Sequence, residues 1–485
     1  MMDMIDSIYD PEFFRQAGHR LVDQLADYLL AARKGQLPVL PEPVPPTLAE
    51  RYQQALPTEP VADPEKCLRQ RLEELIAQGI HLQHPGYIGH QVGAPLPAAC
   101  LAELVTGVFN QSMAVYEMSP SATHIERQTV RWLCSLIGWG KEADGVFTSG
   151  GSLGNLTALL VARNHATGGA AWEKGVHSGP PLTLIVSEHA HYSVARSAGI
   201  LGLGQENVLR VPVDRQFRMD TATVAEGYRA AVAQGKKVVA VVASAGTTAT
   251  GSFDPLREIG EFCRAQGVWF HVDGAHGASV LLGPKYKSLA DGIELADSVI
   301  WDAHKMLFIP GLATALLFRQ GSHGYEAFSQ EASYLFGRHA FPEYDLGLRT
   351  VECTRPMQAW KLWISFQLYG ARGLGELVTH KLDLARTFAA RLKSQPDFDL
   401  LTDPMCNILC FRHLPGGASP GSLAVEELNA HQAKIRKRVL ASGKFFLVQT
   451  RIGEALYLRC TLMNAHTTEQ DLVRLIELLR ECATN

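Results

Sequence analysis

Ser298-Val299-Ile300-Trp301 leads directly into Asp302-Ala303-His304-Lys305. Upstream, a second apolar run, Val268-Trp269-Phe270-His271-Val272, ends in Asp273. Short β-branched and aromatic runs bounded by polar residues predict buried strands. Because the carboxyl ends of neighbouring parallel strands meet at one edge of a sheet, we expect Asp273 and Lys305 to emerge side by side. The two motifs therefore predict an open α/β fold with a site at that edge.

A lysine and a carboxylate at one sheet edge are the pair that pyridoxal phosphate requires. The amine binds the aldehyde of the cofactor covalently, and the carboxylate keeps the ring nitrogen protonated so that the ring withdraws electrons. We predict Lys305 as the covalent attachment and Asp273 as the partner of the ring nitrogen. A structural aspartate or a solvated lysine is the alternative for either residue alone, so the prediction depends on what else lies at this edge.

A third apolar run, Gly145-Val146-Phe147-Thr148, passes into Ser149-Gly150-Gly151-Ser152 and a helical pattern over residues 156–163. Unbonded backbone N–H groups at a helix N-terminus bind anions, and a serine hydroxyl adds a donor. We predict that Gly151 and Ser152 bind a phosphate. A plain tight turn is the alternative. The sequence of this glycine-containing segment matches neither a Walker A loop nor a dinucleotide-binding fingerprint, which disfavours nucleotide binding.

Two more apolar runs precede polar residues that suit this cofactor. Leu182-Thr183-Leu184-Ile185-Val186 comes before His191, and Val238-Val239-Ala240-Val241-Val242-Ala243 opens into Gly246-Thr247-Thr248. A flat imidazole at His191 could stack on the ring and touch the reacting carboxylate, and threonine hydroxyls could meet the phenolic oxygen. A histidine bonded to backbone and a threonine that caps a turn are the alternatives.

Composition narrows the class of protein. The chain has 485 residues, 46% hydrophobic and 19% charged, which is too long for one ordinary domain. A formal net charge of -4 leaves no basic field for nucleic acid. Nine cysteines, an odd number without a Cys-x-x-Cys pair, indicate neither a disulfide framework nor a zinc site and suit a reducing cytoplasm. No apolar run approaches the roughly eighteen residues that a membrane span needs. We expect a small-molecule partner.

The chain is expected to divide into three parts. Residues 11–32 carry apolar side chains at helical spacing, and the prolines of 37–46 favour an extended connector. We therefore expect an N-terminal helical segment at 1–85 that packs on a partner subunit. Alternating strand and helix patterns predict a large cofactor-binding domain with a mostly parallel sheet at 86–375. A smaller α+β domain is expected at 376–485.

In order and spacing, these motifs resemble the group II pyridoxal-phosphate amino-acid decarboxylases, the family of glutamate, aromatic amino-acid and diaminobutyrate decarboxylases. The matching residues are Phe14-Arg15, Val22-Asp23, Ala26-Asp27-Tyr28, His84-Pro85, Ser119-Pro120 with Glu126, Ser149-Gly150-Gly151-Ser152, His191, Gly246-Thr247-Thr248, His271-Val272-Asp273 and His304-Lys305. The resemblance implies the aspartate-aminotransferase fold (fold type I), a homodimer with active sites at the subunit interface, and decarboxylation of an L-amino acid to its amine and carbon dioxide.

The resemblance also implies roles for cofactor-binding residues. Ala275 and His191 would sandwich the ring, and Thr247 would lie near the phenolic oxygen. The phosphate would be bound by Gly151, Ser152 and His304. Three positions depart from the commoner wording of the family: Gly274 and His276 stand where many members have alanine and an aromatic residue, and Ala303 where many have proline.

Three further candidates rest mainly on the resemblance. Tyr334, twenty-nine residues after Lys305, would protonate Cα of the substrate, although a Tyr-Leu-Phe triplet also suits a core. Arg459 would bind a substrate carboxylate through its planar guanidinium, although an arginine at a strand end is also a common surface charge. His90, in the segment His84-Pro85-Gly86-Tyr87-Ile88-Gly89-His90-Gln91, is a candidate for substrate binding.

Several alternatives stay open. An oxidative relative would release an aldehyde, ammonia and peroxide, a transaminase would release a keto acid, and a silent relative would bind the cofactor without turnover. Acidic, diamino and aromatic side chains all remain possible for the substrate.

Overall fold

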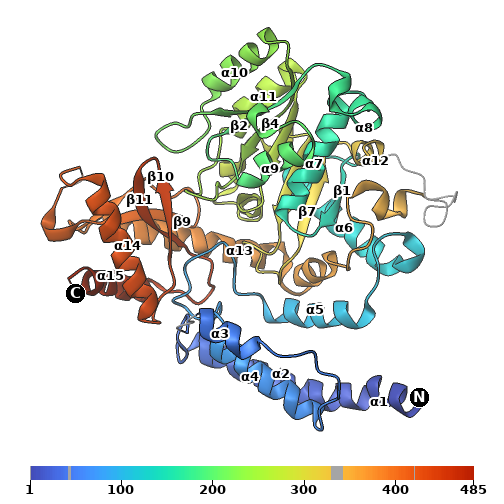
Figure 1. Cartoon of the computed structure of the whole chain (residues 1–485). Coiled ribbons are helices and arrows are strands. Elements are labelled where there is room, and N and C mark those ends of the chain that lie inside the picture. The colour runs from blue at the N-terminus through green and yellow to red at the C-terminus, as the bar shows by residue number, and fades with distance from the viewer. Residues whose placement is uncertain (1, 42–44, 329–341, 420, 485) are drawn as a thin grey trace. The chain divides into compact units, whose positions relative to one another are not determined.

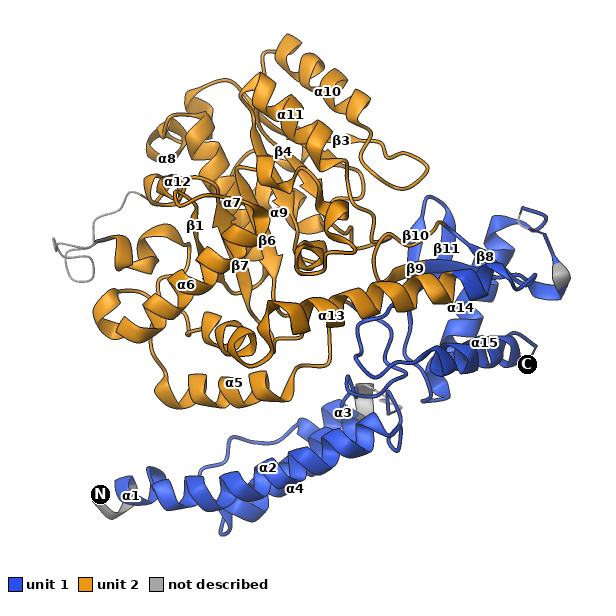
Figure 2. Cartoon of the chain, turned by 180° about the vertical axis from the view of Figure 1, so that it is seen from behind, with its two compact units in different colours: residues 1–90, 390–401, 410–485 blue, residues 91–389, 402–409 orange. Residues whose placement is uncertain are grey.

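The computed structural model describes residues 2–41, 45–328, 342–419 and 421–484. Two compact units make up the chain (Figure 2). Unit 1 contains residues 1–90, 390–401 and 410–485, and unit 2 contains residues 91–389 and 402–409. Unit 1 thus groups the N-terminal segment with most of the C-terminal region, whereas three separate parts were expected, and that finer division stays a prediction.

Unit 2 is built on a seven-stranded sheet (Figure 1). In spatial order its strands are β1 (Asp144–Thr148), β7 (Thr314–Phe318), β6 (Ser298–Asp302), β5 (Trp269–Asp273), β4 (Lys237–Ser244), β2 (Leu182–Ser187) and β3 (Val208–Val211). Only β7 runs antiparallel to its two neighbours, and the pairs from β6 to β3 are parallel. The expected mostly parallel sheet is confirmed, with β3 and β7 as strands that the sequence analysis did not name.

Four strands of this sheet are buried along their whole length, which explains why their sequences are almost continuously apolar. Every residue of β2, β5, β6 and β7 is buried. Helices cover a sheet of this kind on both faces, so its strands read as apolar runs without alternation. The core of unit 2 includes Val146, Leu159, Leu184, Val242, Trp269, Ile300 and Leu316.

Helices of unit 2 surround this sheet. Helix α7 (Gly151–Ala166) lies across β1, β7, β6, β5 and β4 and packs against α9 (Tyr192–Ile200). Two others, α10 (Thr221–Ala233) and α11 (Leu256–Gln266), pack on each other and on β4. The remaining helices are α5 (Pro97–Phe109), α6 (Pro120–Ile137), α8 (Ala170–Lys174) and α12 (Ser322–Glu326).

The long helix α13 (Ala359–Lys393) is interrupted at Gly370. This residue has φ 66° and ψ 162°, a backbone conformation that glycine adopts without steric cost.

Unit 1 begins with four helices, α1 (Met2–Ile8), α2 (Pro11–Arg33), α3 (Pro45–Tyr52) and α4 (Pro64–Gln78). Asp10 caps α2 by accepting hydrogen bonds from the backbone N–H groups of Glu12 and Phe13, at 2.9 and 3.2 Å. The proline at position 11 suits the first helical turn because its missing N–H would have no partner there. The expected helix at 11–32 is therefore present as α2.

The rest of unit 1 combines strands with two helices. A four-stranded sheet has the order β10 (Val448–Ile452), β11 (Ala455–Thr461), β9 (Ile408–His413) and β8 (Phe398–Leu400). Helix α14 (Val425–Ala441) packs on β11 and on α15 (Glu469–Thr484). Within the described ranges, no helix has the length and apolar character needed to cross a bilayer.

Candidate active site

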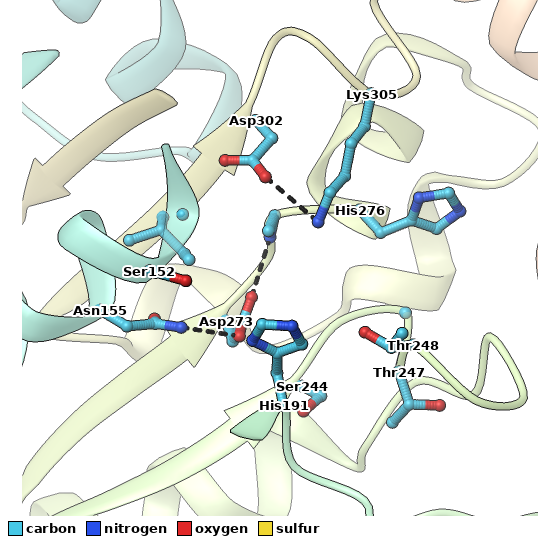
Figure 3. A pocket seen from close by; sticks show the side chains of 14 residues that line it. Ser152, Asn155, His191, Ser244, Thr247, Thr248, Asp273, His276, Asp302 and Lys305 are labelled. Atoms are coloured by element: carbon cyan, nitrogen blue, oxygen red, sulfur yellow. Dashed lines mark hydrogen bonds and ion pairs between the residues drawn. The ribbon is translucent and has the colours of Figure 1, made fainter. Parts of the chain in front are cut away.

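One cavity of unit 2 brings together most of the predicted site residues (Figure 3). It lies where β4, β5 and β6 end and where α7 begins. Its lining includes the predicted residues Gly151, Ser152, His191, Thr247, Asp273, Ala275 and Lys305. The lysine and the carboxylate that the sequence placed at one sheet edge thus share a cavity.

Lys305 follows β6 and forms an ion pair inside this cavity. Its Nζ atom lies 3.1 Å from Oδ2 of Asp302, the last residue of β6. Asp302 is only 2% exposed and also accepts a hydrogen bond from the Thr314 hydroxyl. The sequence alone predicted no role for Asp302, although it stands in the same motif as Lys305.

Asp273, the last residue of β5, is held by two donors. Its Oδ2 accepts a hydrogen bond from Nδ2 of Asn155 at 3.0 Å, and its Oδ1 accepts one from the backbone N–H of Ala275 at 3.2 Å. Donors to a carboxylate favour its charged form. The buried amide of Asn155 on α7 was not found from the sequence, because an asparagine in a helix carries no motif by itself.

His191 caps the N-terminus of α9. Its Nδ1 lies 2.7 Å from the Ser193 hydroxyl and accepts from the Ser193 backbone N–H. Burial is the main reason why the pKa of His191 lies below its usual value. The negative charge of Asp273 opposes this shift, and the positive charge of Lys305 adds to it. A neutral imidazole at this place suits stacking on an aromatic ring.

The predicted phosphate loop forms the start of α7. Gly151 and Ser152 belong to its first turn, where backbone N–H groups have no carbonyl partner within the helix. A Cβ atom on Gly151 would lie 3.2 Å from both carboxylate oxygens of Asp302. Glycine at position 151 therefore permits the start of α7 to lie close to the Asp302 carboxylate.

Two of the predicted cofactor contacts have other bonding partners in the structure. His304 does not line the cavity; its Nδ1 lies 3.2 Å from the Ala313 carbonyl oxygen. Thr247 does line the cavity, but its hydroxyl bonds to the Thr250 hydroxyl at 2.9 Å. The roles of His304 at the phosphate and of Thr247 at the phenolic oxygen stay predictions.

Two of the three positions that differ from the common family sequence, Gly274 and His276, can be explained by their surroundings. A Cβ atom on Gly274 would lie 2.9 Å from the Ile300 carbonyl oxygen, so the neighbouring strand leaves no room for alanine. His276 is buried and its Nε2 lies 2.7 Å from Oδ1 of Asn407. For Ala303 the structure offers no comparable reason.

Two of the remaining candidates, Arg459 and His90, are not among the residues that line this cavity. Arg459 on β11 of unit 1 is buried, and its Nη2 lies 3.3 Å from the Thr461 hydroxyl. The pKa of His90, also in unit 1, is lowered by burial first and then by the charges of Arg459 and Arg436. These three cationic or basic side chains are therefore neighbours in unit 1. Tyr334 lies outside the described residues.

The cavity has the chemical groups that pyridoxal phosphate needs. It offers an amine for covalent attachment, a hydrogen-bonded carboxylate for the ring nitrogen, an imidazole for the ring face and a glycine-containing helix start for the phosphate. On a mostly parallel sheet, this set defines a pyridoxal-phosphate enzyme of fold type I.

Comparison with known proteins gives the family. The model of the pyridoxal-dependent decarboxylase conserved domain matches residues 45–414, and the chain belongs to this family. The chain is 32% identical over 426 residues to the acidic amino acid decarboxylase GADL1 of Bos taurus, covering 86% of this chain and 81% of that one. It is 27% identical over 479 residues to the aromatic-L-amino-acid decarboxylase of Bacillus atrophaeus, covering 97% and 96%.

Solved structures agree with the fold. The crystal structure of mouse CSAD in apo form superposes with a TM-score of 0.92 at 26% identity, covering 98% of this chain and 99% of that one. A rice TDC structure with pyridoxal phosphate and tryptamine superposes with a TM-score of 0.90 at 22% identity, over 98% of each chain. The protein is therefore a pyridoxal-phosphate-dependent amino-acid decarboxylase. Because the relatives named above are decarboxylases, the oxidative and catalytically silent alternatives are not favoured.

When bound, pyridoxal phosphate would supply electron withdrawal from Cα of the substrate, and the cavity that contains Lys305, Asp273 and His191 would hold it. The residues of the chain provide the surroundings for this step. Asp273 would supply a negative charge there, a preorganised electrostatic contribution to the transition state.

Proposed function

We propose that this decarboxylase acts on a small acidic L-amino acid. Relatives with names of this kind support the proposal: the bovine GADL1, an L-aspartate decarboxylase of Metarhizium robertsii at 33% identity, and the cysteine sulfinic acid decarboxylase of Mus musculus at 34%. The relative named for aromatic substrates has a lower identity, 27%, although it covers more of the chain.

The cluster of Arg459, Arg436 and His90 in unit 1 supports an acidic substrate. An acidic amino acid carries two carboxylates, and a cationic cluster would stabilise the second one, whereas a diamino acid would be repelled. We propose that Arg459 binds a substrate carboxylate and that His90 contributes to the same binding. Burial first, and then the charges of Arg459 and Arg436, lower the pKa of His90, so it would contribute as a neutral donor near pH 7.

The cofactor-binding and catalytic roles predicted from the sequence belong to this proposal. Lys305 binds the cofactor covalently, Asp273 pairs with its ring nitrogen, and His191 with Ala275 flanks the ring. Tyr334 returns a proton to Cα. The shared cavity of the first four residues supports these roles.

A panel of L-amino acids tests the substrate. We expect carbon dioxide and amine from aspartate, glutamate or cysteine sulfinate, and far slower release from 2,4-diaminobutyrate, tyrosine and tryptophan. Arg459→Gln should lower kcat/KM on the acidic substrate by about 10²-fold, since a charge-assisted contact is lost. Arg451→Gln on β10 is the matched control, because this arginine is exposed. Preferred turnover of a diamino or aromatic substrate would reject the acidic assignment.

The covalent role of Lys305 has a direct test. Lys305→Ala should lose both turnover and the visible absorbance of the lysine-bound cofactor, while free cofactor still enters the cavity. Normal turnover in this variant would reject the assignment.

We propose a homodimer in which the N-terminal helices contact the partner subunit. Phe13, Phe14, Val22, Leu25 and Leu30 of α2 are all at least 37% exposed, and contiguous exposed apolar surface marks interaction sites. The double substitution of Phe14 and Leu25 by Asp should yield monomer in sedimentation velocity. Val232→Asp, at an equally exposed apolar residue of α10, should leave the dimer intact. The three-part division and a cytoplasmic location, which the cysteine pattern favours, belong to the same proposal.

A further inference from the structure

A continuous series of hydrogen bonds runs beneath the cofactor cavity. It connects the Trp269 indole to the His191 imidazole through four other side chains. Its members, in order, are Trp269, Ser298, His271, Asn155, Ser193 and His191, and Asp273 joins it at Asn155. We call this series the relay. Its four inner members, from Ser298 to Ser193, are at most 1% exposed, so water does not compete for their bonds.

Asp273 determines how the Asn155 amide is oriented. An ionised carboxylate only accepts hydrogen bonds, so the amide nitrogen must face it, and Nδ2 lies 3.0 Å from Oδ2 of Asp273. The second proton of Nδ2 points to the Ser193 hydroxyl oxygen at 2.9 Å. The amide oxygen then faces Nε2 of His271 at 2.9 Å.

This orientation fixes the proton of His271. Burial lowers the pKa of His271 to about 4, so the ring is neutral near pH 7 and carries one N–H. Nε2 faces an acceptor, the Asn155 amide oxygen, and therefore holds that proton. Nδ1 accepts from the Ser298 hydroxyl at 2.8 Å, and the Ser298 oxygen accepts from the Trp269 indole N–H at 2.9 Å. Each donor between Trp269 and Asn155 in the relay therefore has an acceptor.

The other end of the relay acts on His191. Because the Ser193 oxygen already accepts from Asn155, its own proton is available for Nδ1 of His191 at 2.7 Å. The Ser193 backbone N–H also points to this nitrogen. Nδ1 is therefore an acceptor, and the proton of a neutral His191 must be on Nε2.

We propose that the relay holds His191 as the neutral tautomer protonated on Nε2 and couples it to Asp273, with Ser193 and Asn155 as positioning residues. This inference rests on the proposed roles of His191 and Asp273 in the cavity. The charged groups that act on His191 are Asp273 from β5, Asp302 and Lys305 at the end of β6, and Arg196 from α9. Their charges are of both signs, so the relay decides which nitrogen carries the proton.

A neutral donor suits decarboxylation. The substrate carboxylate loses its charge as it leaves, so an imidazolium would stabilise the ground state more than the transition state. The Nε2–H group of a neutral ring can orient the substrate carboxylate while stabilising its charged ground state less than an imidazolium would. The relay thus gives a role in catalysis to three buried polar residues for which no cofactor contact was predicted: His271, Ser193 and Ser298.

Nitrogen-15 NMR of the full-length protein with imidazole-labelled histidine tests the tautomer directly, with and without cofactor. The His191 signals are assigned by their loss in His191→Gln. We expect the proton on Nε2 in the native protein and loss of this preference in Ser193→Ala. Ser193→Thr, which keeps the hydroxyl, should restore it.

Ser279→Ala is the matched control. The Ser279 hydroxyl is fully buried and accepts from the Trp301 indole at 2.9 Å, as Ser298 does from Trp269, but it lies outside the relay. This variant should leave the His191 signals unchanged. In turnover, the acid limb of kcat/KM should move to higher pH in Ser193→Ala alone, because the neutral ring loses a donor.

A native protein with the proton on Nδ1, or a tautomer unaffected by Ser193→Ala, would overturn the proposal. Either result leaves the decarboxylase assignment untouched. Conversely, the NMR result does not depend on which substrate is turned over, so failure of the acidic-substrate proposal would be recognised separately.

Discussion

Lys305 Nζ lies 3.1 Å from Oδ2 of Asp302, a carboxylate that is almost completely buried. Removing one partner of a buried pair leaves the other without compensation. The lysine must also lose a proton before its amine can attack the aldehyde of the cofactor. Asp302 is therefore well placed to accept that proton, which would leave Lys305 with the neutral amine that attacks the aldehyde.

Asp302→Asn should slow incorporation of cofactor. The amide keeps the shape of the side chain and can still accept from Lys305, but it cannot take up a proton. We expect the rate at which the apoenzyme gains visible absorbance to fall by about 10²-fold at saturating cofactor. Asp291→Asn, at an exposed carboxylate paired with Arg257, is the control and should incorporate cofactor normally. Equal rates for native enzyme and Asp302→Asn would show that Asp302 is not the proton acceptor.

Residues at strand ends could be predicted from the sequence, because a buried parallel strand carries its own apolar signature. The runs before Asp273 and Lys305 became β5 and β6, and their ends share a cavity. Strand β7 was not named, although all its residues are apolar or threonine and buried. It is only five residues long, and a short apolar run does not by itself distinguish a strand from other buried segments.

Partners far apart in the chain could not be predicted. Asn155 bonds to His271 and Asp273, more than a hundred residues away, and no spacing rule connects them. His304 was expected at the phosphate from its place in the motif. That role stays a prediction. The ring's Nδ1 lies 3.2 Å from the Ala313 carbonyl oxygen and its Nε2 lies 3.5 Å from Oδ2 of Asp302, contacts that the motif does not predict.

Glu126 and Arg355 form a buried ion pair of this long-range kind. Both side chains are at most 1% exposed, and the contact uses both guanidinium terminal nitrogens. Glu126 also accepts from the Phe147 backbone N–H at 3.0 Å, near the C-terminal end of β1. The pair therefore connects α6, β1 and the segment before α13.

Arg355→Ala should destabilise the protein strongly. It leaves a buried carboxylate without its partner, which costs about 3–5 kcal/mol. Arg257→Ala breaks exposed ion pairs with Asp291 and Glu294 and should cost far less. Urea denaturation followed by circular dichroism measures both. Similar midpoints for the two variants would mean that the buried pair contributes little.

Gly151→Ala should weaken cofactor binding more than it weakens the fold. The added methyl group would lie 3.2 Å from both oxygens of Asp302, a contact that is relieved only by moving the carboxylate or the start of α7. Overpacking of this kind costs about 1–3 kcal/mol. Titration of the apoenzyme with cofactor should show about a tenfold weaker Kd or more. Gly140→Ala, whose added Cβ meets nothing within 4 Å, is the control.

His271 should make stability depend on pH. Burial lowers its pKa to about 4, below the value of about 6.5 expected in the unfolded chain. Between these values the unfolded chain binds a proton that the folded protein does not bind. Stability is therefore complete above about pH 6.5 and falls as the pH drops towards about 4.

His271→Gln should remove this part of the pH dependence. The variant loses relay hydrogen bonds and should be less stable by about 1–3 kcal/mol near pH 7. Its stability should then change less than that of the native protein between about pH 7 and about pH 5, because the titrating group is gone. Urea midpoints at the two pH values measure the difference. His19→Gln, at an exposed histidine of α2, should retain the native pH dependence. A parallel loss of stability in His271→Gln and native protein would place the acid sensitivity on other groups.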